Sequence, residues 1–294
     1  MTDTVVPAPV VAVLGTGTMG AGMVRSLVRA GVPVRMWNRD PAKAQALAGP
    51  SAAARDSPAD AAQGADVVLT MLIDADSVAD VIRRAAPAPG TIWLQCATVG
   101  IEGAERTIAI ADELGLVLVD APVMGTKKPA EDGQLVVMAS GPEETRELLA
   151  PVFDAISRKV LWLGPAGAGS RLKLACNAWV FMLTAGVAQS VALARGLGVD
   201  PQNFLEVIDG GPLGAPYALV KGRNAIAGEY PVSFALSGAM KDNRLIRSAL
   251  ASAGLSDRLT AAVLETMEEA AGRVDDGGRV DMIALIEGLP ANGA

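Results

Sequence analysis

Lys173 and Asn177 are the pair of residues in this chain best suited to proton transfer. They stand four residues apart at the start of a long apolar stretch, which would place both side chains on one face of a helix. A desolvated lysine has a lowered pKa and can donate a proton to a carbonyl oxygen. A lysine at a helix end can equally extend its amine into solvent, and the spacing alone leaves both interpretations open.

The absence of histidine narrows the possible chemistry. The 294 residues contain no histidine and only two cysteines, Cys96 and Cys176, which lie far apart. This composition excludes Ser-His-Asp triads, Cys-His pairs and His-ligated metals. The cysteines have no metal-type spacing and indicate reduced thiols rather than a disulfide framework. We therefore predict no metal site.

A glycine-rich motif near the N-terminus has the pattern of a dinucleotide-binding loop. It reads Gly15-Thr16-Gly17-Thr18-Met19-Gly20 and stands between the apolar run 11–14 and the helical stretch 21–30. Gly15 would permit a tight turn, Gly17 would let a pyrophosphate approach the backbone, and Gly20 would allow close packing of helix on strand. Glycines often serve turns alone, but a position between strand and helix favours a cofactor loop.

The end of the second apolar run indicates which nicotinamide cofactor binds. An NAD enzyme would place a carboxylate there, on the ribose 2′-hydroxyl. This chain has Asn38 and Arg39 instead, and a guanidinium suits a 2′-phosphate, so we predict NADP, with NAD possible. Asp40 would repel the phosphate if it faced it, or would cap the helix that starts at Pro41.

The elements that must position these residues alternate between strands and helices in the first half of the chain. Such alternation predicts an α/β fold, a Rossmann domain with a doubly wound parallel sheet. We expect its strands at five apolar runs, 10–14, 34–37, 67–72, 91–95 and 117–121. Two further runs, 135–139 and 160–163, bracket the helical stretch 143–153 and are expected to extend the same sheet.

A flexible GPAGAG segment at 164–169 marks the expected domain boundary. We predict an NAD(P)-binding domain over residues 1–164 and an all-α substrate and dimerisation domain over 165–294. Ser170 is the expected N-cap of the long apolar helix. Breaks between later helices are expected at Gly210–Pro216 and Asp275–Gly278.

Composition and charge limit the partners. The formal net charge is −7 and there is no run of Lys and Arg, so we expect no binding to nucleic acid or to an anionic membrane. The uncharged stretch 174–194 has the length of a membrane span. Its polar residues favour a buried or dimer-forming helix instead. The first nine residues lack the apolar core of a signal peptide, so we expect a cytoplasmic protein.

Five motifs follow one another along the chain, and they are GTGTMG at 15–20, WNR at 37–39, DAPVMGTKKPAEDGQL at 120–135, GAGSRLKLACN at 167–177 and FALSGAMKDNRL at 234–245. In this order they resemble the β-hydroxyacid dehydrogenase family, which includes 3-hydroxyisobutyrate dehydrogenases and glyoxylate/succinic semialdehyde reductases. The resemblance covers nearly the whole chain. The third motif is more similar to the reductase branch. Together with the long apolar helix, the resemblance implies a homodimer or larger homo-oligomer.

The resemblance also implies roles for individual residues. Lys173 would be the catalytic acid/base, Asn177 would orient the substrate, and Thr98 would lie beside the nicotinamide, with Leu72 also on the cofactor side. The remaining matches lie in the segment that closes over the cofactor and active site in this family, and they are Phe234, Lys241 and Asp242. On their own, Phe234 would be a core residue and the other two a solvated pair.

The substrate loop departs from the family pattern. Where the family usually has Ser-Gly, this chain has Met124-Gly125-Thr126, so backbone N–H groups and Thr126 remain as donors. The leading hypothesis is reversible hydride transfer to a small aldehyde or ketoacid, or from a β-hydroxyacid. An imine reductase and a catalytically silent NADP-binding interaction module are the alternatives. Lys173 argues against the first alternative, and an intact set of Lys173, Asn177 and Asp242 argues against the second.

Overall fold

The computed structural model describes residues 8–274 and 279–289. The chain divides into two compact units, 1–173 and 174–294. The expected break at Asp275–Gly278 and most of the N-terminal tail lie outside the described residues. The domain division after residue 164 stays a prediction.

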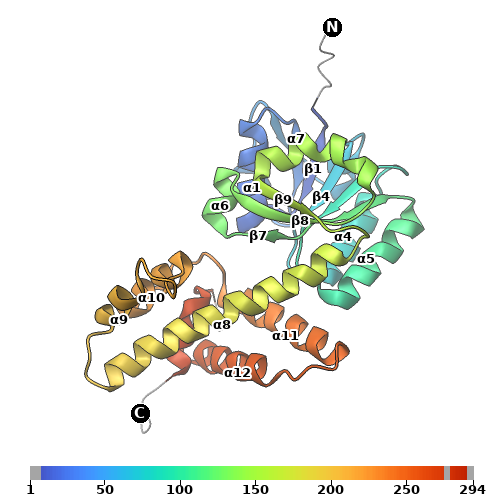
Figure 1. Ribbon diagram of the computed structural model, residues 1–294. Coiled ribbons are helices and arrows are strands. Elements are labelled where there is room, and N and C mark those ends of the chain that lie inside the picture. The colour runs from blue at the N-terminus through green and yellow to red at the C-terminus, as the bar shows by residue number, and fades with distance from the viewer. Residues whose placement is uncertain (1–7, 275–278, 290–294) are drawn as a thin grey trace. The chain divides into compact units, whose positions relative to one another are not determined.

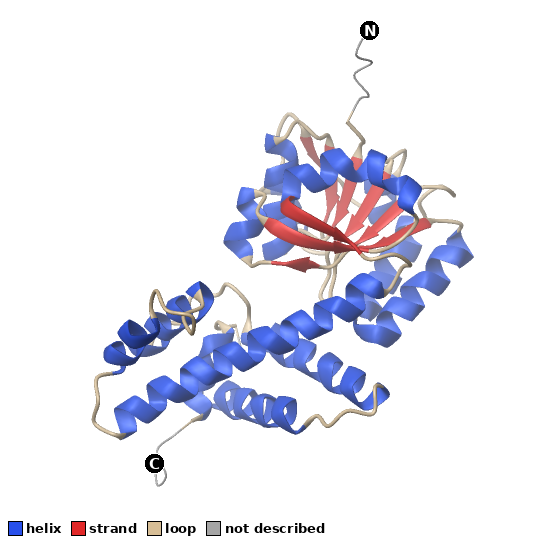
Figure 2. Ribbon diagram, viewed as in Figure 1, coloured by secondary structure: helices blue, strands red, loops and turns tan. Residues whose placement is uncertain are grey.

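The N-terminal unit is built on a six-stranded parallel sheet with helices on both faces (Figure 1, Figure 2). The order of its strands is β3-β2-β1-β4-β5-β6. The strands are β1 (Val11–Leu14), β2 (Val34–Trp37), β3 (Ala52–Ala54), β4 (Val67–Thr70), β5 (Ile92–Gln95) and β6 (Val117–Asp120). This arrangement confirms the predicted doubly wound α/β fold.

The apolar runs form central strands because both faces of the sheet are covered. In β1, Val11 and Val13 belong to the core on one face, and Ala12 and Leu14 to the core on the other; all four are fully buried. A parallel sheet between two helical layers requires such uninterrupted apolar strands. The helices that follow the strands are α1 (Thr18–Arg29), α2 (Pro41–Gln45), α3 (Pro58–Ala62), α4 (Ala75–Ala85) and α5 (Gly100–Leu114).

Successive strands are added on one side of β1 and then on its other side, and a ligand crevice is expected where this change occurs. β2 pairs with one edge of β1 and β4 with the other, so the connections after β1 and β4 leave the sheet in opposite directions. Ligands of doubly wound folds bind outside the carboxyl ends of the strands at such a switch point. The loop at 15–20 follows β1 there.

The prediction that runs 135–139 and 160–163 extend the parallel sheet is wrong. They form β8 (Leu135–Ala139) and β9 (Ser157–Trp162) of a separate three-stranded sheet, with β7 (Val123–Met124) antiparallel to β8. Pro122 follows β6 and has no N–H to continue its ladder, so the chain turns away after Asp120. The helices of this segment are α6 (Lys127–Asp132), η1 (Glu143–Thr145) and α7 (Arg146–Ile156).

The C-terminal unit is all-α over its described residues, as predicted. Helix α8 (Ala168–Gly196) begins in the N-terminal unit and continues into the C-terminal unit. The expected break at Gly210–Pro216 is confirmed, because one helix ends at Ile208 and the next begins at Pro216. The other helices are α9 (Pro201–Ile208), α10 (Pro216–Ala227), α11 (Leu236–Ser252), α12 (Arg258–Arg273) and η2 (Met282–Gly288).

Among the described residues, α8 is the helix that is long and apolar enough to cross a membrane. Of the most apolar 18-residue stretch of α8, 39% is buried inside the protein. The buried helix of a folded domain meets the same criteria of length and composition, so they do not by themselves indicate a membrane span.

Candidate active site

The glycine loop joins β1 to α1, and two of its glycines are required by the protein's own packing. Gly15 has φ +108°, and a Cβ there would lie 2.4 Å from the carbonyl oxygen of Met71 and 2.8 Å from Leu72 Cδ2. A Cβ on Gly20 would lie 1.9 Å from the Gly15 carbonyl oxygen. Gly15 thus allows the segment after β4 to pack closely on the loop, and Gly20 allows α1 to do so.

Gly17 is the loop glycine that this packing does not require. Apart from its chain neighbours, no described heavy atom lies within 4 Å of a Cβ built on it. The hydroxyl of Thr16 is buried and has no hydrogen-bond partner within the described part of the chain. Thr18 and Met19 follow in the first turn of α1, where N–H groups lack partners within the helix. These features fit a dinucleotide pyrophosphate.

The end of β2 is tied to the glycine loop by Asn38. Its side-chain oxygen accepts the Thr16 N–H at 3.2 Å, and its Nδ2 donates to the Asp40 carbonyl oxygen at 3.0 Å. The Asp40 carboxylate caps α2 by accepting a first-turn N–H at 3.2 Å and lies 4.0 Å from Lys43 Nζ. The capping interpretation of Asp40 is therefore confirmed, and Arg39 stands exposed beside it.

Leu72 and Thr98 follow β4 and β5, the next strands beyond β1. The Leu72 side chain borders the turn at Gly15. The buried amide of Gln95 accepts the Ala97 N–H at 2.7 Å and donates to the Ala97 carbonyl oxygen at 2.9 Å. This closed pair of bonds fixes the backbone just before Thr98. The predicted cofactor residues of the N-terminal unit thus follow the carboxyl ends of the neighbouring strands β2, β1, β4 and β5.

The substrate loop brings Met124 to Lys173. Lys173 is 8% exposed, and its Nζ donates to Met124 Sδ at 3.2 Å. Gly125 has φ +134°, and a Cβ there would lie 2.6 Å from Leu135, so the fold itself requires a glycine at this position. Thr126 precedes α6 without a side-chain capping bond. Lys173 therefore faces a thioether where the family pattern has a hydroxyl.

The start of α8 is held by a buried carboxylate rather than by an N-cap serine. The helix begins at Ala168, so the prediction that Ser170 is its N-cap is wrong. Asp120 accepts the Ser170 N–H at 2.8 Å and the Ser170 hydroxyl at 2.7 Å. Burial raises the pKa of Asp120 above its ordinary value, and the bonds from Ser170 oppose that shift.

In the C-terminal unit the predicted residues form two contacts between α8 and the segment 234–242. Asn177 is 1% exposed, and its Nδ2 donates to an Asp242 carboxylate oxygen at 2.8 Å. The other Asp242 oxygen lies 2.6 Å from Lys241 Nζ. Phe234 packs on Phe181, with ring centroids 6.0 Å apart. Asp242 thus fixes the amide of Asn177.

A buried ion pair holds the backbone at Phe234. Asp281 accepts hydrogen bonds from Lys221 Nζ, from the Ser233 N–H and hydroxyl at 2.9 Å each, and from the Phe234 N–H at 3.1 Å. Burial acts to raise the pKa of Asp281, but the charge and hydrogen bond of Lys221 lower it overall. The buried Asp281 carboxylate therefore holds the backbone at Ser233 and Phe234.

Sequence reasoning missed the residues that hold the site in place. Gln95, Asp120 and Asp281 are each fully buried and polar, and each fixes backbone next to a predicted site residue. Gln95 and Asp120 end apolar strands, which was a usable signal, because a polar residue there must find a partner. Asp281 carried no such signal.

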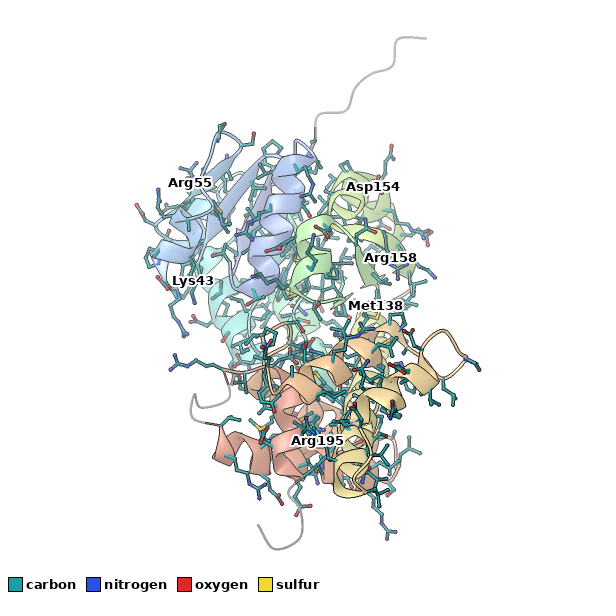
Figure 3. All side chains as sticks on the ribbon, turned by 90° about the vertical axis from the view of Figure 1, so that its left-hand side faces the viewer. Lys43, Arg55, Met138, Asp154, Arg158 and Arg195 are labelled. Atoms are coloured by element: carbon teal, nitrogen blue, oxygen red, sulfur yellow. The ribbon has the colours of Figure 1, made fainter. Side chains whose placement is uncertain are left out.

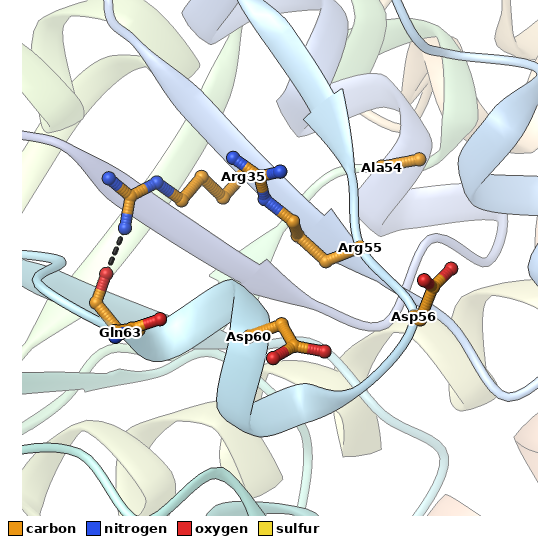
Figure 4. Close-up of a pocket in the computed structure, with 6 residues that line it drawn as sticks. All are labelled: Arg35, Ala54, Arg55, Asp56, Asp60 and Gln63. Carbon is orange, nitrogen blue, oxygen red and sulfur yellow. Dashed lines mark hydrogen bonds between the residues drawn. The ribbon is translucent and has the colours of Figure 1, made fainter.

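A separate hollow lies beside β2, β3 and α3 (Figure 4). Its volume is about 510 Å³, and its lining residues are Arg35, Ala54, Arg55, Asp56, Asp60 and Gln63. The lining carries two guanidinium groups and two carboxylates, so their formal charges cancel, and Arg35 donates to the Gln63 carbonyl oxygen. None of the predicted site residues lines the hollow. Figure 3 shows Arg55 and Lys43 at the protein surface. The described residues contain no group of His, Cys, Asp and Glu suited to a metal ion.

Two family models together match almost the whole chain. Residues 10–164 match the NAD binding domain of 6-phosphogluconate dehydrogenase. Residues 167–289 match the NAD-binding model of NADP-dependent 3-hydroxyisobutyrate dehydrogenase.

Individual relatives agree with these models. Glyoxylate/succinic semialdehyde reductase 2 of Arabidopsis thaliana, a chloroplastic protein, is 32% identical over 285 residues, which cover 95% of this chain and 78% of the relative. NAD-dependent L-serine dehydrogenase of Pseudomonas aeruginosa is 34% identical over 203 residues, 67% of this chain and 68% of the relative. The solved structure of Mycobacterium tuberculosis 3-hydroxyisobutyrate dehydrogenase with L-serine has a TM-score of 0.85 at 28% identity and covers 97% of this chain and 100% of that one.

Proposed function

Because the chain belongs to the β-hydroxyacid dehydrogenase family, we propose that it transfers a hydride between NADP and a small carbonyl or hydroxyacid substrate, with Lys173 as the general acid/base. Membership makes the chain an NAD(P)-dependent oxidoreductase that acts on a CH–OH group. The preference for NADP, the substrate and the residue roles are our proposals.

The observation that carries the role of Lys173 is its burial at the start of α8. Its amine contacts Met124 of the substrate loop, and Asn177 follows one turn later on the same helix. The nicotinamide, when bound, supplies the hydride for reduction and accepts it in oxidation. In reduction, a C–H bond forms at the carbonyl carbon, the π electrons move to oxygen, and the Lys173 ammonium protonates that oxygen. Oxidation reverses both transfers.

Asn177 and Asp242 act with Lys173 in this proposal. The Asp242 carboxylate accepts a hydrogen bond from Asn177 Nδ2, which fixes the plane of the amide. The second N–H of this amide is the proposed donor to the substrate oxygen. Lys241 and Phe234 belong to the segment that closes over the cofactor and substrate in the family. A fixed amide stabilises charge on the oxygen without reorganising during the reaction.

The proposed preference for NADP rests on Arg39 and on the commitment of Asp40. The Asp40 carboxylate caps α2 and lies near Lys43, so its charge is partly balanced. The exposed guanidinium of Arg39 then provides a forked donor for a 2′-phosphate. The remaining cofactor contacts are proposed at the glycine loop, Asn38, Leu72 and Thr98.

The proposed substrate is a small aldehyde or ketoacid, or the matching β-hydroxyacid. The loop residues Met124, Gly125 and Thr126 would receive it, with backbone N–H groups and the Thr126 hydroxyl as donors. The Met124 thioether makes this end less polar than a serine would. A substrate of lower polarity than 3-hydroxyisobutyrate fits this change.

A substitution at Lys173 tests the proposed role. Lys173→Ala is expected to retain NADPH binding and to lose at least about 100-fold in kcat, the usual contribution of a general acid. Lys159→Ala, at an exposed lysine of the same unit, is the matched control and should keep full turnover. The assay panel contains glyoxylate, succinic semialdehyde, methylmalonate semialdehyde and a cyclic imine.

Each result of this assay has one meaning. Turnover of an aldehyde with NADPH that is lost in Lys173→Ala supports the proposal. Full turnover by the folded variant contradicts the role of Lys173. Preference for the imine makes the protein an imine reductase, and cofactor binding without any turnover makes it a silent binding module.

We also propose that the protein is a homodimer or larger homo-oligomer located in the cytoplasm. Large apolar side chains stand exposed along α8, where Trp179 is 64% and Leu193 is 59% exposed. Exposed apolar area of this kind on one helix favours burial against a second chain. A monomer in multi-angle light scattering at micromolar concentration would contradict the oligomer.

A further inference from the structure

We propose that Asp120 and Ser170 are positioning residues for Lys173: their buried hydrogen bonds anchor the first turn of α8 and thereby place the Lys173 amine. This inference rests on the proposed function, because it concerns the residue assigned there as the acid/base. It gives a part in placing the Lys173 amine to two residues for which neither the sequence motifs nor the family resemblance implied any part in catalysis.

The anchor is a carboxylate that uses both of its oxygens. Asp120 is the last residue of β6 and is fully buried. One oxygen accepts the Ser170 N–H at 2.8 Å, and the other accepts the Ser170 hydroxyl at 2.7 Å. Ser140 adds its hydroxyl at 3.3 Å from the first of these oxygens. A carboxylate at a helix N-terminus also interacts favourably with the helix dipole.

Further contacts next to the anchor place the start of α8 against strand backbone. Asp120 and Ser140 exchange two backbone hydrogen bonds, at 2.8 and 2.9 Å, and the Ser140 hydroxyl accepts the Gly169 N–H at 2.9 Å. A Cβ on Gly169 would lie 2.2 Å from the Met138 carbonyl oxygen and 2.9 Å from that of Asp120. The first turn of α8 thus rests directly on strand backbone.

One short segment contacts α8 at two points. Asp120 binds Ser170, and Met124, four residues further along that segment, contacts the amine of Lys173 at 3.2 Å. Ser170 and Lys173 are three residues apart and are therefore neighbours on the helix surface. Loss of the first contact would let the helix start shift, and the amine would shift with it. A displacement of about 1 Å can cost about 100-fold in rate.

A role in stability alone is the alternative, since any buried helix cap stabilises a fold. The two roles differ in what happens when Lys173 is absent. A positioning residue loses its effect on kcat in the Lys173→Ala background, because no amine remains to be placed. Loss of a residue that only stabilises the fold would reduce kcat by the same factor in the wild-type protein and in Lys173→Ala.

Ser170→Ala is the main test variant, because it removes one hydroxyl and keeps the backbone bond to Asp120. We expect kcat to fall by about tenfold, equivalent to about 1.4 kcal/mol, with an unchanged Kd for NADPH and no further loss in Lys173→Ala. Asp120→Asn, which cannot accept both bonds, is expected to lose more if it folds. Thr107→Val is the matched control, because Thr107 is 2% exposed and donates one buried hydrogen bond within α5.

A second measurement does not depend on turnover. Acetic anhydride acylates accessible amines, and peptide mass spectrometry gives the rate at Lys173 relative to exposed Lys159 in the same molecule. Ser170→Ala should raise this ratio in the full-length protein, whereas Thr107→Val should not. An unchanged ratio, or an equal loss of kcat in both backgrounds, would overturn the inference. Full turnover by Lys173→Ala would refute the proposed function, and the labelling ratio would still decide whether Ser170 anchors the amine.

Discussion

The substitution Gly17→Ala separates a glycine needed by a ligand from a glycine needed by the fold. Gly17 has φ −69° and ψ −168°, a conformation open to alanine. No described heavy atom beyond its chain neighbours lies within 4 Å of the added Cβ. The added methyl group would therefore stand in the space where we expect the pyrophosphate to approach the backbone.

The effects on stability and on binding have different sizes. Alanine at an N-cap stabilises a helix less than glycine does, by about 0.5–1 kcal/mol. Alanine also makes the unfolded chain less flexible, which raises the free energy of unfolding by about 0.4–1 kcal/mol. The free energy of unfolding should therefore change by less than about 0.5 kcal/mol. Loss of one backbone hydrogen bond to a charged phosphate costs about 1.5–3 kcal/mol. That loss raises the Kd for NADPH by about 10- to 150-fold.

Fluorescence titration with NADPH and urea denaturation of the same preparations measure both quantities. Gly49→Ala is the matched control, since Gly49 also has open surroundings in the N-terminal unit and stands outside the cofactor loop. Its Kd should equal that of the wild type. A folded Gly17→Ala protein with wild-type affinity for NADPH would refute the cofactor approach at this glycine.

Three further substitutions test other parts of the site. Arg39→Ala should lower kcat/KM with NADPH by about 10- to 100-fold, as expected for loss of charge-assisted bonds, and leave NADH turnover unchanged; equal losses with both cofactors would contradict the proposed role of Arg39. Met124→Ser should raise kcat/KM for a small hydroxyacid relative to an aldehyde of lower polarity, and no change in this ratio would count against a selecting role. Asp281→Asn should destabilise the protein by about 3 kcal/mol, because it leaves the buried Lys221 ammonium without its counter-ion. The folded state lowers the pKa of Asp281. The ionised carboxylate therefore contributes fully to the free energy of unfolding above the unfolded-state pKa of about 3.9, and this contribution is lost as the pH falls through the lower folded-state pKa. The difference in urea midpoint between wild type and Asp281→Asn should therefore narrow below about pH 4, and a constant difference there would contradict this reasoning.

The doubly wound sheet and its glycine loop could be predicted because they depend on local pattern. Uninterrupted apolar runs are required of strands covered on both faces, and a GxGxxG between such a strand and a helix has few other uses. Strand β3 gave no such signal. Its three alanines form a strand because they pair with β2 in register, from Val34 with Ala52 to Met36 with Ala54.

Local patterns along the chain were enough to predict the Rossmann-type α/β unit, the all-α unit after it, the family and the residues proposed for chemistry. Three features became visible only in the folded protein: β8 belongs to a separate sheet, Asp120 rather than Ser170 caps α8, and Met124 contacts the Lys173 amine. Periodicity and motif spacing act over a few residues and can be read along the chain. Asp120 and Ser170 lie 50 residues apart in sequence, and their contact exists only after the strands have packed and the polar groups have been matched.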